Sequence, residues 1–463
     1  MHPHPPDEPR ASWIPLILLA VAQFMVVLDI TIVNVALPSI GEDVGLAGPD
    51  LQWVVTVYVL LTGGLLLLGG RLADVLERRV VFVAGLSVFT VASLLNGLAE
   101  TPGTLIGARA LQGVGAALLT PAALSLVTGI YAGRQRTAAL TAWSAIGSAG
   151  AAVGVVLGGV LTTALSWEWI FLVNVPIGAT AALLALRVLP ANRPAAGRSL
   201  DLPGALLVVG GLVVLVYAIE GAAEHGWGSA RTLVLGGLAV ALLAAFARVE
   251  ALARQPLMPP AVWRIRSLTG GGALMLAATG LLVGTFFLNS LYLQQVLGSS
   301  ALETGLGFLP FALAIGIGAH LTSRLLPKAG SRVLAGVGMA LVAAGAIALA
   351  AAPDRASYAA DLLPGLLAIG FGTGLVFPSA SVAAMHDVGH HEAGLAAGML
   401  STAHELGAAL GVAVLAAVAG AGGAAGYEDG FLVAAGIAVA SAAVALVAAP
   451  SVKPAPDARA MAH

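Results

Sequence analysis

The chain has 463 residues, of which 59% are hydrophobic and only 10% are charged, and its net charge is -2. Soluble domains carry about 25% charged residues, so this composition excludes a soluble domain, and nothing in the charge indicates a nucleic-acid partner. The chain has no cysteine, which excludes disulfides, thiolate metal sites and cysteine nucleophiles. Apolar stretches of about 20 residues recur along the chain and predict a polytopic helical membrane protein.

Residues 1–12 are polar, lack the features of a cleavable signal peptide, and are expected to form a cytoplasmic tail. Fourteen apolar stretches follow, and each is long enough to cross a bilayer as a helix. The chain is expected to end in a second cytoplasmic tail, 451–463. The predicted spans are 13–36, 51–70, 80–99, 103–126, 138–163, 169–188, 203–220, 232–250, 270–293, 304–325, 332–352, 358–382, 396–420 and 430–449.

The basic residues support an even number of spans with both termini in the cytoplasm. Of the 21 Lys and Arg residues, 18 fall in the tails and in the alternate loops on one side. The opposite side holds only Arg231 and Arg355, and Arg109 lies inside a span. Because cytoplasmic loops carry the excess of Lys and Arg, this segregation favours fourteen spans. We expect a multi-pass protein of the bacterial plasma membrane.

Three patterns of the first half recur in the second half, in order and at nearly one offset. Together they indicate two homologous six-helix halves, as in transporters built from parallel repeats. We therefore expect a first bundle at 13–190, a two-helix insert with linkers at 191–262, and a second bundle at 263–450. The patterns, with their offsets, are Arg71-Leu72 and Arg79-Val80 with Arg324-Leu325 and Arg332-Val333 (253), Gly113-x-Gly115-x5-Pro121 with Gly370-x-Gly372-x5-Pro378 (257), and Gly154-x3-Gly158 with Gly407-x3-Gly411 (253).

One acid and one base lie inside spans of the first half. A charged side chain at the bilayer centre costs at least ~2.5 kcal/mol, so such residues usually have a partner or a function. At 1.5 Å per residue, Asp29 and Arg109 both lie about 10 Å below the outer surface. We expect Asp29 to carry a proton coupled to substrate, with Arg109 modulating it and Gln112 nearby lining the cavity or packing. The alternative is a fixed ion pair that holds the first and fourth helices in register.

Glu405 and His404 lie near the midplane of the thirteenth span. A midplane acid is a candidate for function, so we expect Glu405 to take part in proton coupling and His404 to line the substrate cavity. In the alternative, one of the two lines water and the other reaches the interface. Asn34 and Asn289, on the first helix of each half, are expected to bind substrate or a helix partner.

Glycines on the fourth and fifth spans are expected to let neighbouring helices approach closely, because small residues drive helix packing in membranes. They are Gly113, Gly115, Gly154, Gly158 and Gly159.

Four sequence motifs occur in order along the first half: LDITIVNVALP at 28–38, GGRLADVLERR at 69–79, ARALQGVGAA at 108–117 and WEWIFLVNVPIG at 167–178. The chain thereby resembles the major facilitator superfamily, and within it the 14-helix drug:proton antiporter branch. The resemblance covers nearly the whole chain. Two departures stand out: Val75 and Glu77 in the loop motif, and Val155 where the antiporter motif of the fifth span has proline.

The resemblance implies a secondary active exporter that exchanges protons for amphipathic or cationic drugs or toxic metabolites by alternating access. It implies that Asp74, Arg78 and Arg79 form a conformational latch, with a purely topogenic positive loop as the alternative. Export of one specific metabolite and proton symport are the other transport hypotheses. A membrane-embedded enzyme or a non-transporting sensor is a remote alternative.

We expect no enzymatic activity and no cofactor, because neither a nucleophile–base pair nor a nucleotide-binding motif is visible. No metal site is expected either. A loop cluster of histidines and acids is interpreted as a solvated connector; it comprises His386, Asp387, His390, His391 and Glu392. The expected partners are a small-molecule substrate, protons and the lipid bilayer, and the protein is expected to be a monomer.

Overall fold

The computed structural model describes residues 12–46, 48–191, 200–353, 356–389, 392–420, 424–448 and 450–452. Apart from Ser12, Ser451 and Val452, the two predicted tails lie outside these residues. The described chain is all-helical and contains no strand. The prediction of an all-α membrane protein is therefore confirmed.

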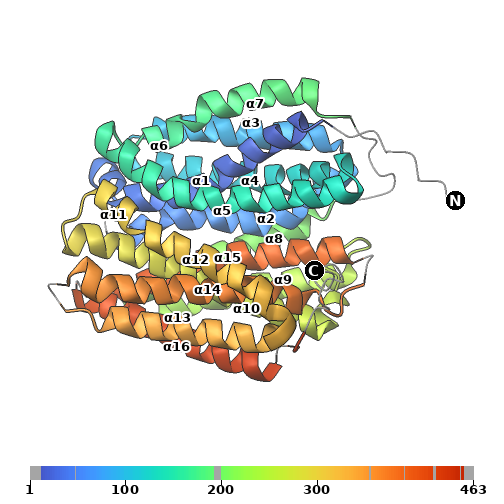
Figure 1. Ribbon diagram of the computed structural model, residues 1–463. Coiled ribbons are helices and arrows are strands. Elements are labelled where there is room, and N and C mark those ends of the chain that lie inside the picture. Colours follow the sequence, from blue (N-terminus) through green and yellow to red (C-terminus); the bar gives the residue numbers. More distant parts are fainter. Residues whose placement is uncertain are drawn as a thin grey trace, which may run out of the picture.

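The helices follow one another with short connections (Figure 1). The first half contains α1 (Ile14–Val44), α2 (Trp53–Val75), α3 (Arg78–Gly97), α4 (Pro102–Ile130), α5 (Gly133–Ala164), α6 (Trp169–Leu172) and α7 (Asn174–Val188). The insert contains α8 (Leu202–His225) and α9 (Ala230–Leu252). The second half contains α10 (Arg266–Leu291), α11 (Ala301–Gly307), α12 (Leu309–Ala329), α13 (Ser331–Ala350), α14 (Leu363–Ala384), α15 (Ala393–Ala419) and α16 (Ala424–Ala448).

Thirteen helical segments of the described chain are long and apolar enough to cross a membrane, and α5 contains a further apolar stretch, Ala152–Ala164. Together they give the fourteen predicted spans. The sixth span consists of α6 and α7, and the tenth of α11 and α12. Single π-helical turns, Tyr292–Val296 and Tyr358–Leu362, end the ninth span and begin the twelfth.

The first helix is longer than the predicted span 13–36. It continues to Val44 because Leu37 and Ile40 remain fully buried beyond Ala36, and Pro38 is accommodated inside it. It ends at Gly45, which takes the left-handed conformation (φ 76°) that closes many helices.

The two halves repeat the same packing, as the offsets predict. Helix α1 packs on α5 as α10 packs on α15, and α4 packs on α2 and α3 as α14 packs on α12 and α13. A threonine hydrogen bond joins two helices in each half: Thr62 Oγ1 donates to Gly113 O at 3.4 Å, and Thr322 Oγ1 donates to Gly374 O at 3.4 Å. In Figure 1 the blue-to-teal half lies above the yellow-to-red half.

The insert joins the two halves along one face. Helix α8 packs against both α2 and α15, while α9 packs mainly against α8 and is largely exposed. Gly64 of α2 allows this approach, since a Cβ there would lie 2.8 Å from Val209 Cγ2. The insert therefore packs, through α8, beside the contact between α2 and α15.

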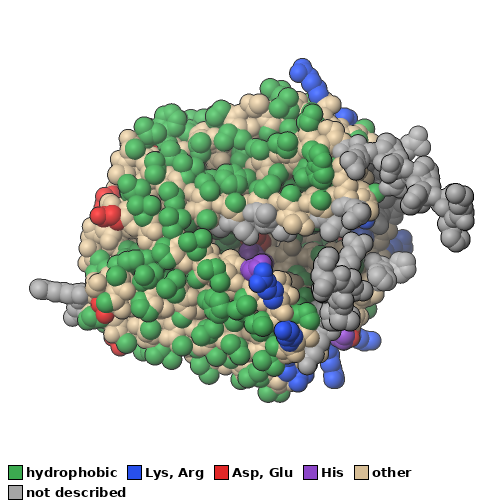
Figure 2. Space-filling model, in the orientation of Figure 1, with side chains coloured by type: hydrophobic (Ala, Val, Ile, Leu, Met, Phe, Trp, Pro, Cys, Tyr) green, Lys and Arg blue, Asp and Glu red, His purple; other side chains and the backbone are tan. Residues whose placement is uncertain are grey.

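The halves also meet at the end of the bundle where α11 lies. Ser290 Oγ donates to Asn34 O at 2.8 Å, and Gln294 Nε2 donates to Val35 O at 3.0 Å. Gly159 of α5 packs there against the backbone of α11. Figure 2 shows a hollow between the two halves in the middle of the face where Figure 1 places α5 and α12. The two halves are thus joined at the α11 end and along α2 and α15, and they are hollowed on the face that Figure 2 shows.

Candidate functional site

The site begins with the way α4 places an arginine inside the first half. Thr101 starts this helix by capping it, with Thr104 N donating to Thr101 Oγ1 at 3.3 Å, and Pro102 stands at the first helical position. Arg109 follows two turns later on the face that packs against α2 and α3. Its side chain is fully buried and is the largest fully buried side chain of the described residues.

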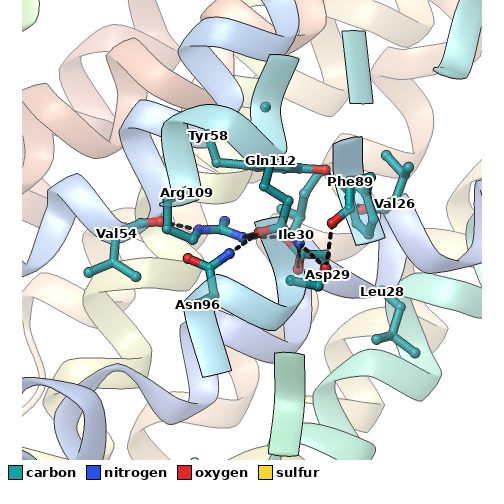
Figure 3. Close-up of polar contacts among 12 residues, drawn as sticks. Val26, Leu28, Asp29, Ile30, Val54, Tyr58, Phe89, Asn96, Arg109 and Gln112 are labelled. Atoms are coloured by element: carbon teal, nitrogen blue, oxygen red, sulfur yellow. Dashed lines mark hydrogen bonds and ion pairs between the residues drawn. The ribbon is translucent and has the colours of Figure 1, made fainter. Parts of the chain in front are cut away.

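Arg109 joins three helices of the first half (Figure 3). Its Nη1 lies 2.5 Å from Asp29 Oδ2 on α1 and also donates to Gln112 Oε1 at 2.6 Å. Its Nε donates to Val54 O, in the first turn of α2, at 2.7 Å. Asp29 and Gln112 are fully buried as well. The two charges that the sequence places inside spans are therefore brought together.

Gln112 connects this ion pair to α3. Its Nε2 donates to Asp29 Oδ1 at 2.7 Å and to Ser93 Oγ at 3.1 Å. Its Oε1 accepts from Asn96 Nδ2 at 2.7 Å as well as from Arg109. Ser93 and Asn96, both fully buried, were missed by the sequence analysis. Their spacing of three residues on one face of an apolar span was the signal available.

Aromatic rings cover the guanidinium. Its Cζ lies 4.3 Å from the centre of the Tyr58 ring and 5.6 Å from that of Phe171. Arg109 Nη2 has no hydrogen-bond partner, so these rings supply its remaining stabilisation through cation–π attraction. The Tyr58 hydroxyl in turn donates to Val26 O of α1 at 3.4 Å.

Both oxygens of Asp29 are satisfied and shielded from solvent in this conformation. Oδ2 faces the guanidinium and Oδ1 accepts from Gln112. The carboxylate is therefore enclosed by a cation on one side and a hydrogen-bond donor on the other. Solvent reaches Asp29 only if the contact with Arg109 or Gln112 opens.

The second half has no counterpart of this pair. The offset of 255 that relates Asn34 to Asn289 places Gly284 opposite Asp29. The offset of 257 for the fourth and twelfth spans places Leu366 opposite Arg109. Both counterparts are buried apolar positions. The ion pair is a departure from the repeat and not an element that both halves need in order to fold.

Glu405 and His404 lie apart from the ion pair, on α15 of the second half. Their side chains are 17% and 42% exposed, and His404 Nδ1 lies 3.5 Å from Glu405 Oε1. Glu405 Oε2 has no hydrogen-bond partner, and the His404 ring lies 5.8 Å from that of Phe377. Unlike Asp29, Glu405 is therefore partly exposed, and its buried Oε2 lacks a hydrogen-bond partner.

Asn34 and Asn289 occupy equivalent places, and both are fully buried. Each Nδ2 donates to the carbonyl four residues earlier, Ile30 O at 2.7 Å and Thr285 O at 2.8 Å. Each Oδ1 lacks a hydrogen-bond partner. In this conformation both side chains lie inside packed helices, beside the contact that joins the halves, and not in an open cavity.

The loop after α2 is held by contacts within the first half. Arg79 Nη2 pairs with Glu77 Oε1 at 2.9 Å, and Arg79 Nη1 donates to Leu189 O at 3.3 Å. Arg78 Nη1 lies 3.5 Å from Ser125 O of α4. Asp74 lies in the last turn of α2. Glu77, a departure from the loop motif, is thus an ion-pair partner of Arg79.

The singled-out glycines all lie where another helix leaves no room for a side chain. A Cβ would meet the neighbouring backbone at 2.6 to 2.8 Å at most of them. The pairs are Gly113 with Tyr58 O, Gly115 with Phe89 N, Gly158 with Ile32 O and Gly159 with Ala301 O; Gly154 packs against the Thr31 side chain. The glycines thus let α4 pack closely on α2 and α3, and let α5 pack closely on α1 and, across the two halves, on α11.

The histidine-rich loop brings no metal ligands together within the described residues, among which no group of three His, Cys, Asp or Glu could hold a metal ion. His390 and His391 lie outside the described residues. The side chains of His386 and Asp387 are 50% and 58% exposed and lie 3.9 Å apart.

Comparison with known proteins gives consistent matches. The family model described as Major Facilitator Superfamily matches residues 19–412. The puromycin resistance protein pur8 of Streptomyces alboniger is 45% identical over 88% of this chain and 82% of its own length. The cephamycin export protein CmcT of Amycolatopsis lactamdurans is 42% identical over 93% and 91%. The solved structure of the human organic anion transporter MFSD10 (TETRAN) has the same fold, with a TM-score of 0.61, 16% identity, and coverage of 93% of this chain and 98% of that one.

Proposed function

The chain belongs to the major facilitator superfamily, and from this premise we propose that it exports amphipathic or cationic antibiotics, or related toxic metabolites, in exchange for protons. It is a multi-pass membrane transporter and not an enzyme. Relatives named for resistance to puromycin, lincomycin and tetracenomycin C, and for export of cephamycin, support the outward direction.

The transport cycle that we propose is alternating access. The halves are joined at the α11 end and along the α2–α15 contact, and they are hollowed on the face where α5 and α12 lie (Figure 2), which suits a state open to one side only. With the termini in the cytoplasm, this state faces inward. Rocking of one half against the other would open the α11 end and close the opposite end.

The proposed proton coupling is supported by one observation. The Asp29–Arg109 pair is fully buried, and the second half does not repeat it. Protonation of Asp29 removes its charge and therefore its attraction for Arg109. The contact between Asp29 and Arg109, on which the hydrogen bonds to Val54 and Gln112 depend, is then weakened. The packing of α1, α2 and α4 changes as a result. A proton bound from outside and released inside would in this way bias the two arrangements.

Glu405 is the proposed contact for a cationic substrate. Its side chain is partly exposed, its buried Oε2 has no hydrogen-bond partner in this conformation, and the Phe377 and His404 rings lie beside it. A cation and a proton would then compete for one carboxylate, because either neutralises it. This competition is the chemical basis of exchange.

The test uses purified protein in sealed vesicles and a fluorescent cationic dye, with a pH difference imposed in either direction. Uphill dye movement that collapses with the gradient is expected for the wild type, and it should be lost in Asp29→Asn and reduced in Glu405→Gln. Glu428→Gln, an exposed acid outside the network, is the matched control. If the wild type moves no compound at any pH difference, the proposal fails; if Asp29→Asn still drives uphill movement, Asp29 is not the proton carrier.

Export of a single metabolite is the second candidate, which the name of the cephamycin exporter favours. A panel of antibiotics tested on a pump-deficient strain expressing the chain separates the two. Protection against several unrelated cations indicates a multidrug exporter, and protection against one chemical class indicates a specific one.

A further inference from the structure

A pair of buried carboxyl groups lies in the two-helix insert, away from Asp29 and Arg109. Asp201 caps α8, with Gly204 N donating to its Oδ1 at 2.9 Å. Glu250 stands in the last turn of α9, and its Oε2 accepts from Met258 N at 2.7 Å. The two residues are only 8% and 3% exposed.

The other oxygen of each group has no hydrogen-bond partner and is buried: Asp201 Oδ2 and Glu250 Oε1. Both oxygens face the same small space over Gly204, where an added Cβ would lie 2.7 Å from the first and 2.8 Å from the second. The two unpartnered oxygens therefore face each other across this space. Because ionised carboxylates only accept hydrogen bonds, this contact becomes a bond only when one of them carries a proton.

Among the residues that the structure describes, no cation is placed to neutralise the pair. Within the described residues, neither Asp201 nor Glu250 forms an ion pair with Lys, Arg or His from α2, α9 or α15. From α2, Arg71 Nη2 donates instead to Gln255 Oε1 at 3.4 Å. Two unpaired negative charges in one buried space repel strongly, so both groups do not ionise together.

We infer that Asp201 and Glu250 share one proton and act as a proton-dependent clasp of the insert. The shared proton joins the start of α8 to the end of α9, and Glu250 also holds Met258, where the chain continues toward the second half. A divalent metal ion does not suit the space, because Mg²⁺ and Ca²⁺ take about six or more oxygen ligands and no third acid or histidine of the described chain joins the pair. The clasp is independent of the proposed transport reaction.

The direct test is infrared difference spectroscopy of the purified full-length protein near neutral pH. The wild type minus Glu250→Gln spectrum should contain the carbonyl band of one protonated carboxyl group. The wild type minus Asp201→Asn spectrum should contain it too, because the amide introduced by Asp201→Asn would donate its own N–H to Glu250 and so remove the need for the proton. If neither difference spectrum contains the band, both groups are ionised and the inference is wrong; if only one contains it, the proton is not shared.

Thermal unfolding gives an independent readout. Burial and the neighbouring Asp201 favour the protonated form of Glu250 in the folded chain, so the native pair keeps a proton that the unfolded chain has already released, and raising the pH should destabilise the wild type more than Asp201→Asn. Asp429→Asn, an exposed acid, should keep the wild-type slope. Equal slopes for the wild type and Asp201→Asn would contradict the clasp. A rise in unfolding temperature with added Mg²⁺ or Ca²⁺, reversed by a chelator and absent in Asp201→Asn, would show a metal site in its place.

Discussion

Gly63 of α2 lies directly against Glu405 of α15, so closely that a Cβ on Gly63 would come 2.5 Å from Glu405 Cβ. The acid that is open to solvent in the second half is therefore seated on the helix that packs against Arg109. One turn earlier on α2, Tyr58 covers the Arg109 guanidinium, and Asp29, Arg109 and Glu405 are all electrostatic neighbours of Tyr58. Helix α2 is thus the physical connection between the two ionisable centres.

Replacing Gly63 by alanine should disturb this contact. The extra methyl group meets Glu405 Cβ and the backbone of Leu406, so α2 and α15 must separate. Overpacking of this kind costs about 1–3 kcal/mol, and dye efflux should fall together with the unfolding temperature. Gly236→Ala is the control, since a Cβ there meets nothing within 4 Å. Wild-type efflux in Gly63→Ala would show that the α2–α15 spacing does not matter for transport.

The ion pair allows a test that separates its structural role from its functional one. Arg109→Met leaves the Asp29 charge buried without a cation, which costs roughly 3–5 kcal/mol. Adding Asp29→Asn removes that charge, so the double variant should be more stable than Arg109→Met alone. Uphill efflux should nevertheless be absent from both. A double variant that regains stability and also transports would reduce the pair to a fixed packing element.

The ion pair was predictable because charged residues inside long apolar stretches are few, and each needs a partner. The division into two halves and an insert stays a prediction from repeated motifs that keep nearly one offset along the chain. The contact of Gly63 with Glu405 and the docking of α8 were not predictable, because a sequence does not tell which face of a uniformly apolar helix meets which neighbour. Ser93 and Asn96 were missed for the same reason, since small polar residues in a span also bond to their own helix.

Gln112 should not tolerate replacement by glutamate, although the two side chains have the same shape. Its Nε2 donates to Asp29 Oδ1, and a carboxylate has no proton to donate unless it is neutral. Gln112→Glu therefore places a second negative charge beside Asp29, and one of the two acids should stay protonated. Gradient-driven efflux should be lost or shifted to higher pH, as a pH profile in vesicles would reveal. An unchanged profile would mean that the network is not coupled to protons.

The contact at the α11 end should set the balance between the two states. Ser290 and Gln294 each donate one interhalf hydrogen bond, to Asn34 O and Val35 O. Each bond contributes about 1 kcal/mol, so Ser290→Ala combined with Gln294→Ala should shift the population toward the state open at this end by roughly 5- to 30-fold.

The shift is measurable because the chain has no cysteine of its own. Spin labels on cysteines introduced at Thr163 and Leu306, exposed positions near the ends of α5 and α11, report the separation by pulsed spectroscopy. The distance distribution should move to longer values in the double variant. If it stays at the wild-type values, these two bonds do not hold the end closed.

The insert should stabilise the Arg109 network through Trp53 at the start of α2. Trp53 Nε1 donates to Glu220 Oε2 of α8 at 2.5 Å, and the next residue, Val54, supplies the carbonyl that holds Arg109 Nε. Trp53→Phe keeps the ring but leaves the buried Glu220 without this donor, which costs about 1–3 kcal/mol. Adding Glu220→Leu removes the unsatisfied acid, so the double variant should recover stability, whereas Trp263→Phe, at an exposed site, should change little. If efflux falls in Trp53→Phe and returns in the double variant, α8 acts by positioning α2. If neither change affects efflux, the insert does not support the Arg109 network.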